Sequence, residues 1–208
     1  MFTGIVKNVS KIQKISYKGN NISLQIEQKS DLKIGESVAV NGVCLSVVEN
    51  KRNSLVFDVV KNTLKGTNIK RLKIGNFVNI EYALKMEDFL SGHIVSGHID
   101  GERKILKKEK TQEGYILDID KILEDKNKVI QKGSITIDGI SLTISDIFYR
   151  YIRIFLIPHT LENTNLKYKK IGDYVNIEFD MLAKYSMLQK EETGITKEFL
   201  IKKGFINI

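Results

Sequence analysis

The sequence has few of the residues from which cross-links and metal sites are built. Its single cysteine, Cys44, cannot form a disulfide within the chain and cannot by itself hold zinc. The three histidines, His93, His98 and His159, lack the spacing of metal ligands. No uncharged run of about 18 residues is present, which excludes a transmembrane helix. We therefore expect no metal site, no disulfide scaffold and no membrane partner.

The first residues show no basic stretch followed by a long apolar one, so no signal peptide is predicted and the expected location is the cytoplasm. The chain has 33 basic and 25 acidic residues and a formal net charge of +8. The two kinds are interspersed, as in residues 107–110, and form no stripe with stacking aromatics. An oligonucleotide-binding barrel would need such aromatics beside clustered lysines. Nucleic acid is therefore not an expected partner.

Three motifs occur twice, each time 97 residues apart. They are 41–47 (NGVCLSV) and 138–144 (DGISLTI), 63–68 (TLKGTN) and 160–165 (TLENTN), and 73–81 (KIGNFVNIE) and 170–178 (KIGDYVNIE). Residues 3–6 and 96–99 also correspond, at a spacing of 93, so the second copy has four more residues before its central motif. This constant spacing predicts two similar domains in tandem. We place them at 1–93 and 94–183, with residues 84–92 as the linker and 184–208 as a separate tail.

Each copy consists of short runs typical of β-strands. In the first copy, residues 21–27, 37–48, 54–60 and 77–82 alternate in polarity or are rich in β-branched and aromatic residues. Closing such strands into a small antiparallel barrel removes exposed edges, which predicts an all-β fold.

Helices are expected at two kinds of place. Thr63 and Thr160 are suited to the N-caps of short helices. Helical spacing first appears in the tail, at 182–192 and 196–203, where Gly204 would be the C-cap.

Small polar residues alternate with leucine at matching places of the two copies. They are Cys44 and Ser46 in the first copy and Ser141 and Thr143 in the second. Each strand would present its polar pair on one side and leucine on the other, an arrangement suited to a flat polar heterocycle. Two copies then imply two equivalent ligands. The glycines that precede these strands, Gly42 and Gly139, most often indicate only a tight turn.

Several motifs in one order resemble the riboflavin synthase family of duplicated lumazine-binding barrels. They are residues 1–6 (MFTGIV), 41–46 with 138–143, 91–100 (SGHIVSGHID) and 156–161 (LIPHTL). The resemblance runs from Met1 to about Asp180 and includes the helical tail. It implies two tandem, similar six-stranded antiparallel Greek-key barrels followed by a C-terminal α-helical segment.

The resemblance also implies a reaction, the last step of riboflavin biosynthesis. Two molecules of 6,7-dimethyl-8-ribityllumazine exchange a four-carbon unit and give riboflavin and 5-amino-6-(ribitylamino)uracil, with no cofactor and no metal. The family forms homotrimers in which the N-terminal barrel of one subunit faces the C-terminal barrel of its neighbour, so the tail helix would be a trimer contact. Association with lumazine synthase stays open.

Site residues follow from the resemblance. The first strand of each pocket would come from Gly4–Val6 and Gly97–Ile99, and its polar strand from residues 44–46 and 141–143. The stretches that close over the ligand would be residues 58–63 and 155–160. Lys132 would make a further contact with the ligand. The substrate-binding residues are thus Phe2, at the mouth, with Gly4, Ile5, Val6, Cys44, Leu45, Ser46, Asp58, Val59, Val60, Lys61, Asn62, Thr63, Gly97, His98, Ile99, Lys132, Ser141, Leu142, Thr143, Phe155, Leu156, Ile157, Pro158, His159 and Thr160.

The catalytic residues implied are Ser141, Cys44, His98, Thr143 and Asp180. Their tasks would be to remove a proton from the C7 methyl group of one lumazine and to stabilise an adduct or a nucleophile at C7 of the other. Asp180 stands where the first copy has Ala83, an asymmetry that fits one donor and one acceptor barrel without saying which is which.

Most of these residues also have a plain structural interpretation. Cys44 could be a small buried hydrophobe, although its counterpart Ser141 is polar. His98 could carry a proton near neutral pH or be satisfied by backbone contacts, and His93 is interpreted as structural. Lys132 could be a surface lysine in a turn. His159 replaces a carboxylate that is common in the family, which leaves the hydrogen bonding of its loop open.

A second hypothesis is a non-catalytic lumazine- or flavin-binding accessory protein of the same fold. Such proteins keep one competent pocket and act as monomers. The second copy retains Ser141 and Thr143, and the tail is present, so the sequence favours the enzyme.

Overall fold

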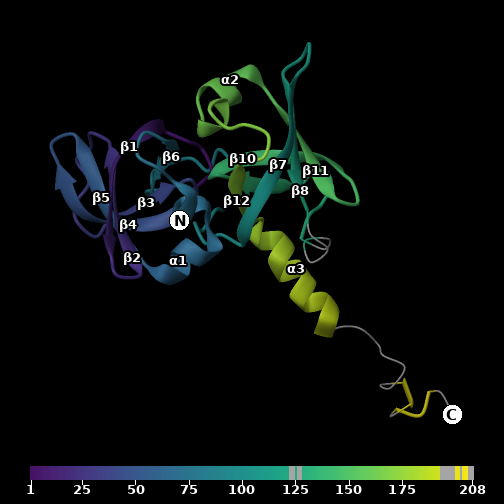
Figure 1. Cartoon of the computed structure of the whole chain (residues 1–208). Coiled ribbons are helices and arrows are strands. Elements are labelled where there is room, and N and C mark those ends of the chain that lie inside the picture. The colour runs from purple at the N-terminus through teal and green to yellow at the C-terminus, as the bar shows by residue number, and fades with distance from the viewer. Residues whose placement is uncertain (122–124, 126–127, 193–199, 202, 206–208) are drawn as a thin grey trace.

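The computed structural model describes residues 1–121, 125, 128–192, 200–201 and 203–205. Two closed antiparallel barrels lie side by side, and a helix extends away from the second one (Figure 1). The first barrel contains β1 (Asn8–Lys18), β2 (Asn21–Glu27), β3 (Ser37–Val40), β4 (Val43–Lys51), β5 (Ser54–Val59) and β6 (Phe77–Tyr82). The second contains β7 (Gly101–Lys110), β8 (Tyr115–Asp120), β9 (Ser134–Ile137), β10 (Ile140–Ile147), β11 (Tyr151–Leu156) and β12 (Tyr174–Phe179). The predicted pair of six-stranded barrels is confirmed.

The duplication extends to the order and the irregularities of the strands. Neighbours around the first barrel follow the order β1-β2-β5-β4-β3-β6, and the second repeats it with β7-β8-β11-β10-β9-β12. The register of β1 shifts between Ile12 and Lys14, and that of β7 shifts between Ile105 and Lys107. A bulge bends its strand, so these matching bulges help each copy to close in the same way.

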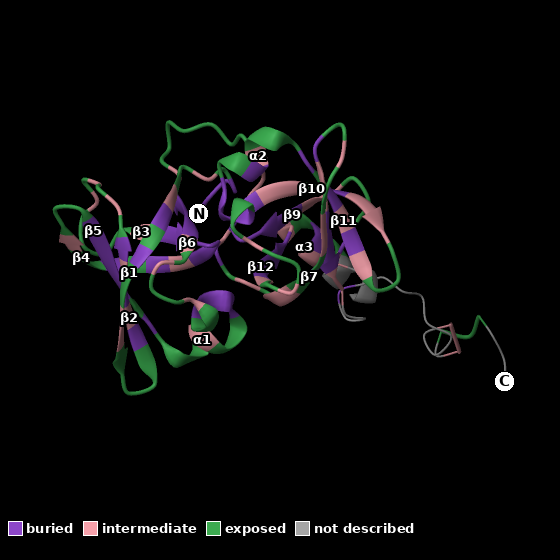
Figure 2. Ribbon diagram, turned by 45° about the horizontal axis from the view of Figure 1, so that its top comes forward, coloured by how far each residue is buried: buried purple, intermediate pink, exposed green. Residues whose placement is uncertain are grey.

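Each barrel encloses its own apolar core. Alternate strand residues point inward, and Leu24 and Phe57 in the first barrel and Ile119 and Ile154 in the second are fully buried. Figure 2 shows this alternation as buried and exposed segments along the strands. Removal of these side chains from water is the main favourable term that holds the barrels closed.

Two strands differ from the sequence prediction. The run 37–48 is two strands, because Asn41 and Gly42 adopt positive φ angles of 46° and 79° and form a two-residue turn between β3 and β4. The strand β1 was not predicted, since lysines occupy its exposed face and only Ser10 and Ile12 are buried along its length.

The prediction that Thr63 and Thr160 cap helices is wrong. Helix α1 (Lys61–Gly66) and helix α2 (Pro158–Glu162) begin three residues earlier than such caps would place them, after the extended residues Val60 and Ile157, which make no side-chain cap. Pro158 already has the φ angle of a first helical residue, which fixes the start of α2. The two threonines lie inside the helices. A 3₁₀ turn follows each helix, η1 (Asn68–Arg71) and η3 (Asn165–Lys167).

The predicted tail helix is present as α3 (Met181–Glu192). The carboxylate of Asp180 accepts the backbone N–H of Leu182 at 2.9 Å and caps its first turn. Of the second predicted helix, residues 196–199 and 202 lie outside the described residues. Gly204 has the φ angle of +76° expected of a C-cap glycine, and its N–H bonds the carbonyl of Ile201.

Within the described part of the chain, no helix is long and apolar enough to cross a membrane.

Candidate functional site

The polar strands are arranged as the alternation predicts. On β4, Leu45 is buried in the barrel core, whereas Cys44 is half-buried and Ser46 is exposed. On β10, Leu142 packs against the core of its barrel, and Ser141 and Thr143 face outward. Each barrel therefore presents a pair of small polar groups on its outer side.

The segments that precede the barrels are exchanged between them. Gly4 accepts the backbone N–H of Ser141 at 2.7 Å, and Gly97 accepts that of Cys44 at 3.0 Å. Val6 packs against the core of the second barrel, and Ile99 packs against the core of the first. Each segment therefore lies along the polar strand of the other copy.

Only glycine fits where the exchanged segments pass these strands. Gly4 and Gly97 have φ angles of +76° and +82°. A Cβ atom on Gly4 would lie 2.6 Å from the Cβ of Ser141, and one on Gly97 would lie 2.6 Å from the Cβ of Cys44. The backbone thus approaches each polar residue more closely than any other amino acid would allow.

Two buried glutamates hold the exchanged segments in place. Glu81 accepts the backbone N–H and the hydroxyl of Thr3 at 2.7 and 2.8 Å, and it accepts the N–H of Gly4 at 3.1 Å. Burial raises the pKa of Glu81, and these hydrogen bonds oppose the shift.

Its counterpart, Glu178, holds the second segment in the same way. It accepts the backbone N–H and hydroxyl of Ser96 at 2.7 and 2.6 Å and the N–H of Gly97 at 3.0 Å. The sequence interpretation missed both glutamates as site residues, although the repeated motif VNIE, which ends at 81 and 178, contains them.

A histidine bridges two hydroxyl groups at the polar strand of the second barrel. His93 Nδ1 lies 2.7 Å from Ser141 Oγ, and its Nε2 lies 3.1 Å from Thr136 Oγ1. Thr136 and Ser141 are directly paired across β9 and β10. The sequence favoured a purely structural role for His93, but this geometry gives it contact with the residue expected to be reactive.

The surroundings of His93 favour its neutral form. Burial lowers the pKa of the imidazole, and the negative charges of Asp180 and Glu178 partly oppose that shift. A neutral imidazole has one N–H donor and one acceptor nitrogen, so it can accept the proton of one hydroxyl while it donates to the other. The arrangement can polarise the Ser141 hydroxyl near neutral pH.

Phe2 does not lie at a pocket mouth as expected. It is fully buried, it packs with Ala39 and Val95, and it exchanges two backbone hydrogen bonds with Val95. Cys44 and Ala83 pack against the same small cluster.

Most of the other predicted site residues are exposed or half-buried. His98 is exposed, and its backbone N–H bonds Ser96 Oγ at 3.1 Å. Lys132 is exposed at a positive φ angle of 65° in the turn before Gly133. Asp58 forms an exposed ion pair with Lys18. The closing stretches contribute the exposed residues Val60, Lys61, Asn62, Phe155, Ile157, Pro158 and His159 and the half-buried Thr63 and Thr160, whereas Val59 and Leu156 point into the cores.

Among the described residues, no group of three or more histidine, cysteine, aspartate or glutamate side chains is placed to hold a metal ion.

The chain belongs to the lumazine binding domain family, which matches it twice, over residues 3–83 and 96–180. The riboflavin synthase of Bacillus subtilis (strain 168) is 37% identical over 215 residues and is aligned over 99% of this chain and 100% of its own length. That of Buchnera aphidicola subsp. Schizaphis graminum is 43% identical, over 86% of this chain and 89% of its own. The resemblance seen in the sequence is confirmed.

Solved structures show the same pair of barrels. LumP complexed with riboflavin superposes with a TM-score of 0.79 at 27% identity, over 86% of this chain and 99% of its own. LumP complexed with 6,7-dimethyl-8-(1'-D-ribityl) lumazine gives a TM-score of 0.78 at 25% identity over the same shares of the two chains.

Proposed function

We propose that this chain is an enzyme that converts two molecules of 6,7-dimethyl-8-ribityllumazine into riboflavin and 5-amino-6-(ribitylamino)uracil. It is a transferase in this proposal, because a four-carbon unit passes from one lumazine to the other. The transfer balances without an added oxidant or metal, since what one molecule loses the other gains. Relatives of the same length that carry the name riboflavin synthase support this assignment.

The observation that carries the proposal is the contact between Ser141 and His93. The two copies are alike in fold, but only the second has this pair, because Thr136 and Ser141 correspond to Ala39 and Cys44 of the first copy. Two binding sites of the same fold but with different reactive side chains suit a reaction in which two identical molecules take different roles. Holding the two reactants in a fixed orientation would itself remove several kcal/mol of the barrier, about 7–11 in the best intramolecular cases.

In this proposal the neutral imidazole of His93 accepts the proton of Ser141, and the hydroxyl oxygen acts at C7 of the lumazine in the second barrel. The proton of the C7 methyl group is removed from the other lumazine, for which Cys44, His98 and Thr143 are the candidate groups. Asp180 is half-buried near His93 and would stabilise the imidazolium that forms.

The exchanged segments define which residues would form each pocket. The pocket of the first barrel would combine residues 44–46 and 58–63 with Gly97–Ile99, and that of the second would combine 141–143, 155–160 and Lys132 with Gly4–Val6. The hydrogen bonds from Cys44 and Ser141 to the exchanged segments support this grouping.

We further infer a homotrimer in the cytoplasm, in which pockets of neighbouring subunits face each other and the tail, 184–208, joins the subunits. The exposed side chain of Tyr185 on α3 supports an apolar contact at the start of this tail. Association with lumazine synthase is a further partner proposal.

The test is to incubate the purified protein with 6,7-dimethyl-8-ribityllumazine, without cofactor, and to follow riboflavin by absorbance and chromatography against a protein-free control. The proposal requires accelerated formation of one riboflavin per two lumazines. Tight binding of lumazine without turnover would instead support an accessory protein that only binds the ligand, for which the complexes of LumP are the precedent.

A further inference from the structure

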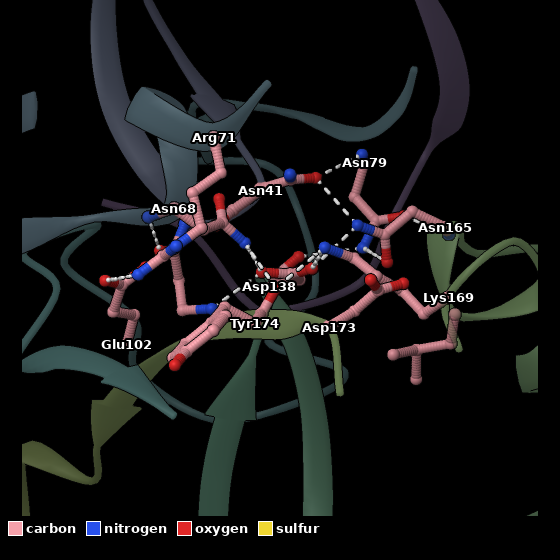
Figure 3. Close-up of polar contacts among 12 residues, drawn as sticks. Asn41, Asn68, Arg71, Asn79, Glu102, Asp138, Asn165, Lys169, Asp173 and Tyr174 are labelled. Carbon is pink, nitrogen blue, oxygen red and sulfur yellow. Dashed lines mark hydrogen bonds and ion pairs between the residues drawn. The ribbon is translucent and has the colours of Figure 1, made fainter. Parts of the chain in front are cut away.

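The turns that begin the two polar strands meet at the centre of the molecule. Asn41 and Gly42 connect β3 to β4, Asp138 and Gly139 connect β9 to β10, and the two turns touch each other. Figure 3 shows the polar groups that surround them, which come from both barrels. These groups include the side chains of two pairs of residues that correspond in the repeat, namely Asn68 with Asn165 and Asn79 with Asn176.

The carboxylate of Asp138 is the most heavily bonded group of this cluster. It is fully buried and accepts the side-chain amides of Asn68 and Asn165 at 2.7 and 2.8 Å and the backbone N–H of Asn176 at 2.7 Å. Lys169 Nζ lies 3.4 Å from its second oxygen and also donates to the carbonyl of Tyr174 at 2.8 Å. A buried carboxylate is tolerated only with such pairing.

The segment that carries Lys169 is in turn held by a second lysine, which is half-buried. Lys108 on β7 donates to the carbonyls of Leu166, Lys167 and Lys169 at 2.7, 3.2 and 2.9 Å. Three carbonyls on one ammonium group fix the path of this segment. The side chains of Lys108, Lys169 and Asp138 are called the charged anchor below.

The first copy has no charge at any of the three corresponding places. Ile15 stands in the place of Lys108, Asn41 in that of Asp138 and Leu72 in that of Lys169. Ile15 and Leu72 pack against the core of the first barrel. The backbone turn is nevertheless the same in both copies, with φ angles of 46° at Asn41 and 45° at Asp138. The turn itself therefore does not require the charges.

The charged anchor acts on the strand pair that carries the reactive groups. The two-residue turn sets the register in which Thr136 faces Ser141, and these are the hydroxyls that the two nitrogens of His93 contact. We propose that Lys108, Lys169 and Asp138 are positioning residues that hold Ser141 against His93, a proposal that rests on the proposed function. The copy without the His93 contact has no such anchor.

The variants Asp138→Asn and Lys169→Leu each break the pair by converting one position to the residue of the first copy. An asparagine at position 138 would place its NH₂ group against the N–H groups that now donate to the Asp138 carboxylate. A leucine at position 169 would leave that buried carboxylate without the Lys169 ammonium group. In the full-length protein each should lower kcat about tenfold to a hundredfold, the cost of misplaced reacting groups, with KM changed less than about threefold. Amide hydrogen exchange of Ser141 should quicken, while that of Cys44 serves as the internal reference.

The double variant Asp138→Asn/Lys169→Leu reproduces the neutral arrangement of the first copy at both places. Its kcat and the exchange rate of Ser141 should lie closer to those of the wild type than the values of the worse single variant do, because the cation and the carboxylate are removed together. Recovery should be partial, since the side-chain amide of Asn165 still donates toward position 138. Lys170→Leu, at an exposed neighbouring lysine, is the control and should change neither quantity.

The anchor proposal is overturned if both single variants keep the wild-type kcat and exchange rate, or if the double variant is no better than the worse single one. A lowered melting temperature with unchanged kcat of the folded protein would show a stabilising role only and would also refute it. Lys169→Leu decides the matter if Asp138→Asn does not fold. A wild-type chain that converts no lumazine refutes the proposed function, whereas the exchange rates still test the anchor.

Discussion

Ser141 and Cys44 occupy the same place in the two copies but have different neighbours. Both donate their backbone N–H to an exchanged segment, and both lie beside a glycine at positive φ. Only Ser141 has an imidazole 2.7 Å from its side chain. A hydroxyl needs such a partner to lose its proton near neutral pH, whereas a thiol has a far lower intrinsic pKa. The residue at each place is therefore matched to its surroundings.

Replacement of Ser141 by alanine should slow riboflavin formation about a hundredfold or more and change KM for lumazine less than about threefold. The hydroxyl acts on the reacting carbon in the proposed mechanism, and the surface that binds the ring is left intact. Steady-state kinetics with Ser23→Ala on β2 as control measure both quantities. Equal losses of binding and of turnover would make Ser141 a binding residue only.

His93 should make the stability of the protein depend on pH in a defined window. Burial lowers the pKa of His93 in the folded state. Below pH 6.5, which is about the pKa of histidine in an unfolded chain, the unfolded protein therefore binds a proton at His93 more readily than the folded protein does. Stability from this residue is present at higher pH and is lost as pH falls from about 6.5 toward the lowered value.

The measurement is the free energy of unfolding in urea for the wild type and for His93→Gln, at pH 7.5 and at pH 5. The advantage of the wild type should shrink at the lower pH, by up to about 1.4 kcal/mol for each unit between the two pKa values. A constant difference between the two proteins would show that His93 does not titrate differently on folding.

The sequence could not say which of two histidines meets Ser141. The phrase Ser-Gly-His-Ile occurs twice, at 91–94 and at 96–99, and both copies resemble the family motif. The chain between His93 and His98 is not a regular strand, since Gly97 has a φ angle of +82°, so strand alternation cannot assign the two side chains to sides. Which side faces the polar strand is decided by the packing of the segment, and that is a tertiary property.

At the scale of elements, the two turns that meet between the barrels are in tight backbone contact. A Cβ atom on Gly139 would lie 2.6 Å from the backbone nitrogen of Gly42, and the converse distance is 2.7 Å. Such contact leaves no room for any side chain at either place. The repeated glycine of the polar motif is thus both a turn residue, as predicted, and a contact between barrels.

Gly139→Ala should therefore destabilise the protein far more than Gly19→Ala. Both glycines have positive φ, 77° and 61°, but nothing lies within 4 Å of a Cβ on Gly19. Backbone strain alone should cost about 1–2 kcal/mol at Gly19, and the clash should add about 1–3 kcal/mol at Gly139. Urea unfolding followed by circular dichroism measures both, and equal losses would contradict a tight contact.

Most strands were predictable from two independent signals, because each has a run of β-branched residues and a counterpart in the other copy of the repeat. The exceptions have physical causes. β1 is long and mostly exposed, so its lysines hide the alternation that marks a strand. The short helices begin where Pro158 and the extended Val60 place them, rather than at the threonines whose hydroxyls suit a cap. The preference of threonine for the N-cap position is therefore weaker there than the backbone conformation of the residues before each helix.

At the scale of the whole molecule, the tail should control assembly without affecting the barrels. Removal of residues 187–208 is expected to give smaller oligomers in analytical ultracentrifugation, because most of the tail proposed to join the subunits, residues 184–208, is lost. The β-sheet signal in circular dichroism should persist, since both cores lie before α3. A truncated chain that still sediments as a trimer would refute the role assigned to the tail.

The exchange of segments, which the repeat spacing could not show, means that neither barrel is complete without residues from the other copy. Two separate copies would have to find each other in solution to achieve this, as in a domain-swapped dimer. Residues 84–92 join them, so the second copy is always present at a high effective concentration. The two barrels should therefore close on each other within one chain, and in the chain that lacks residues 187–208 the midpoint of unfolding should not depend on protein concentration.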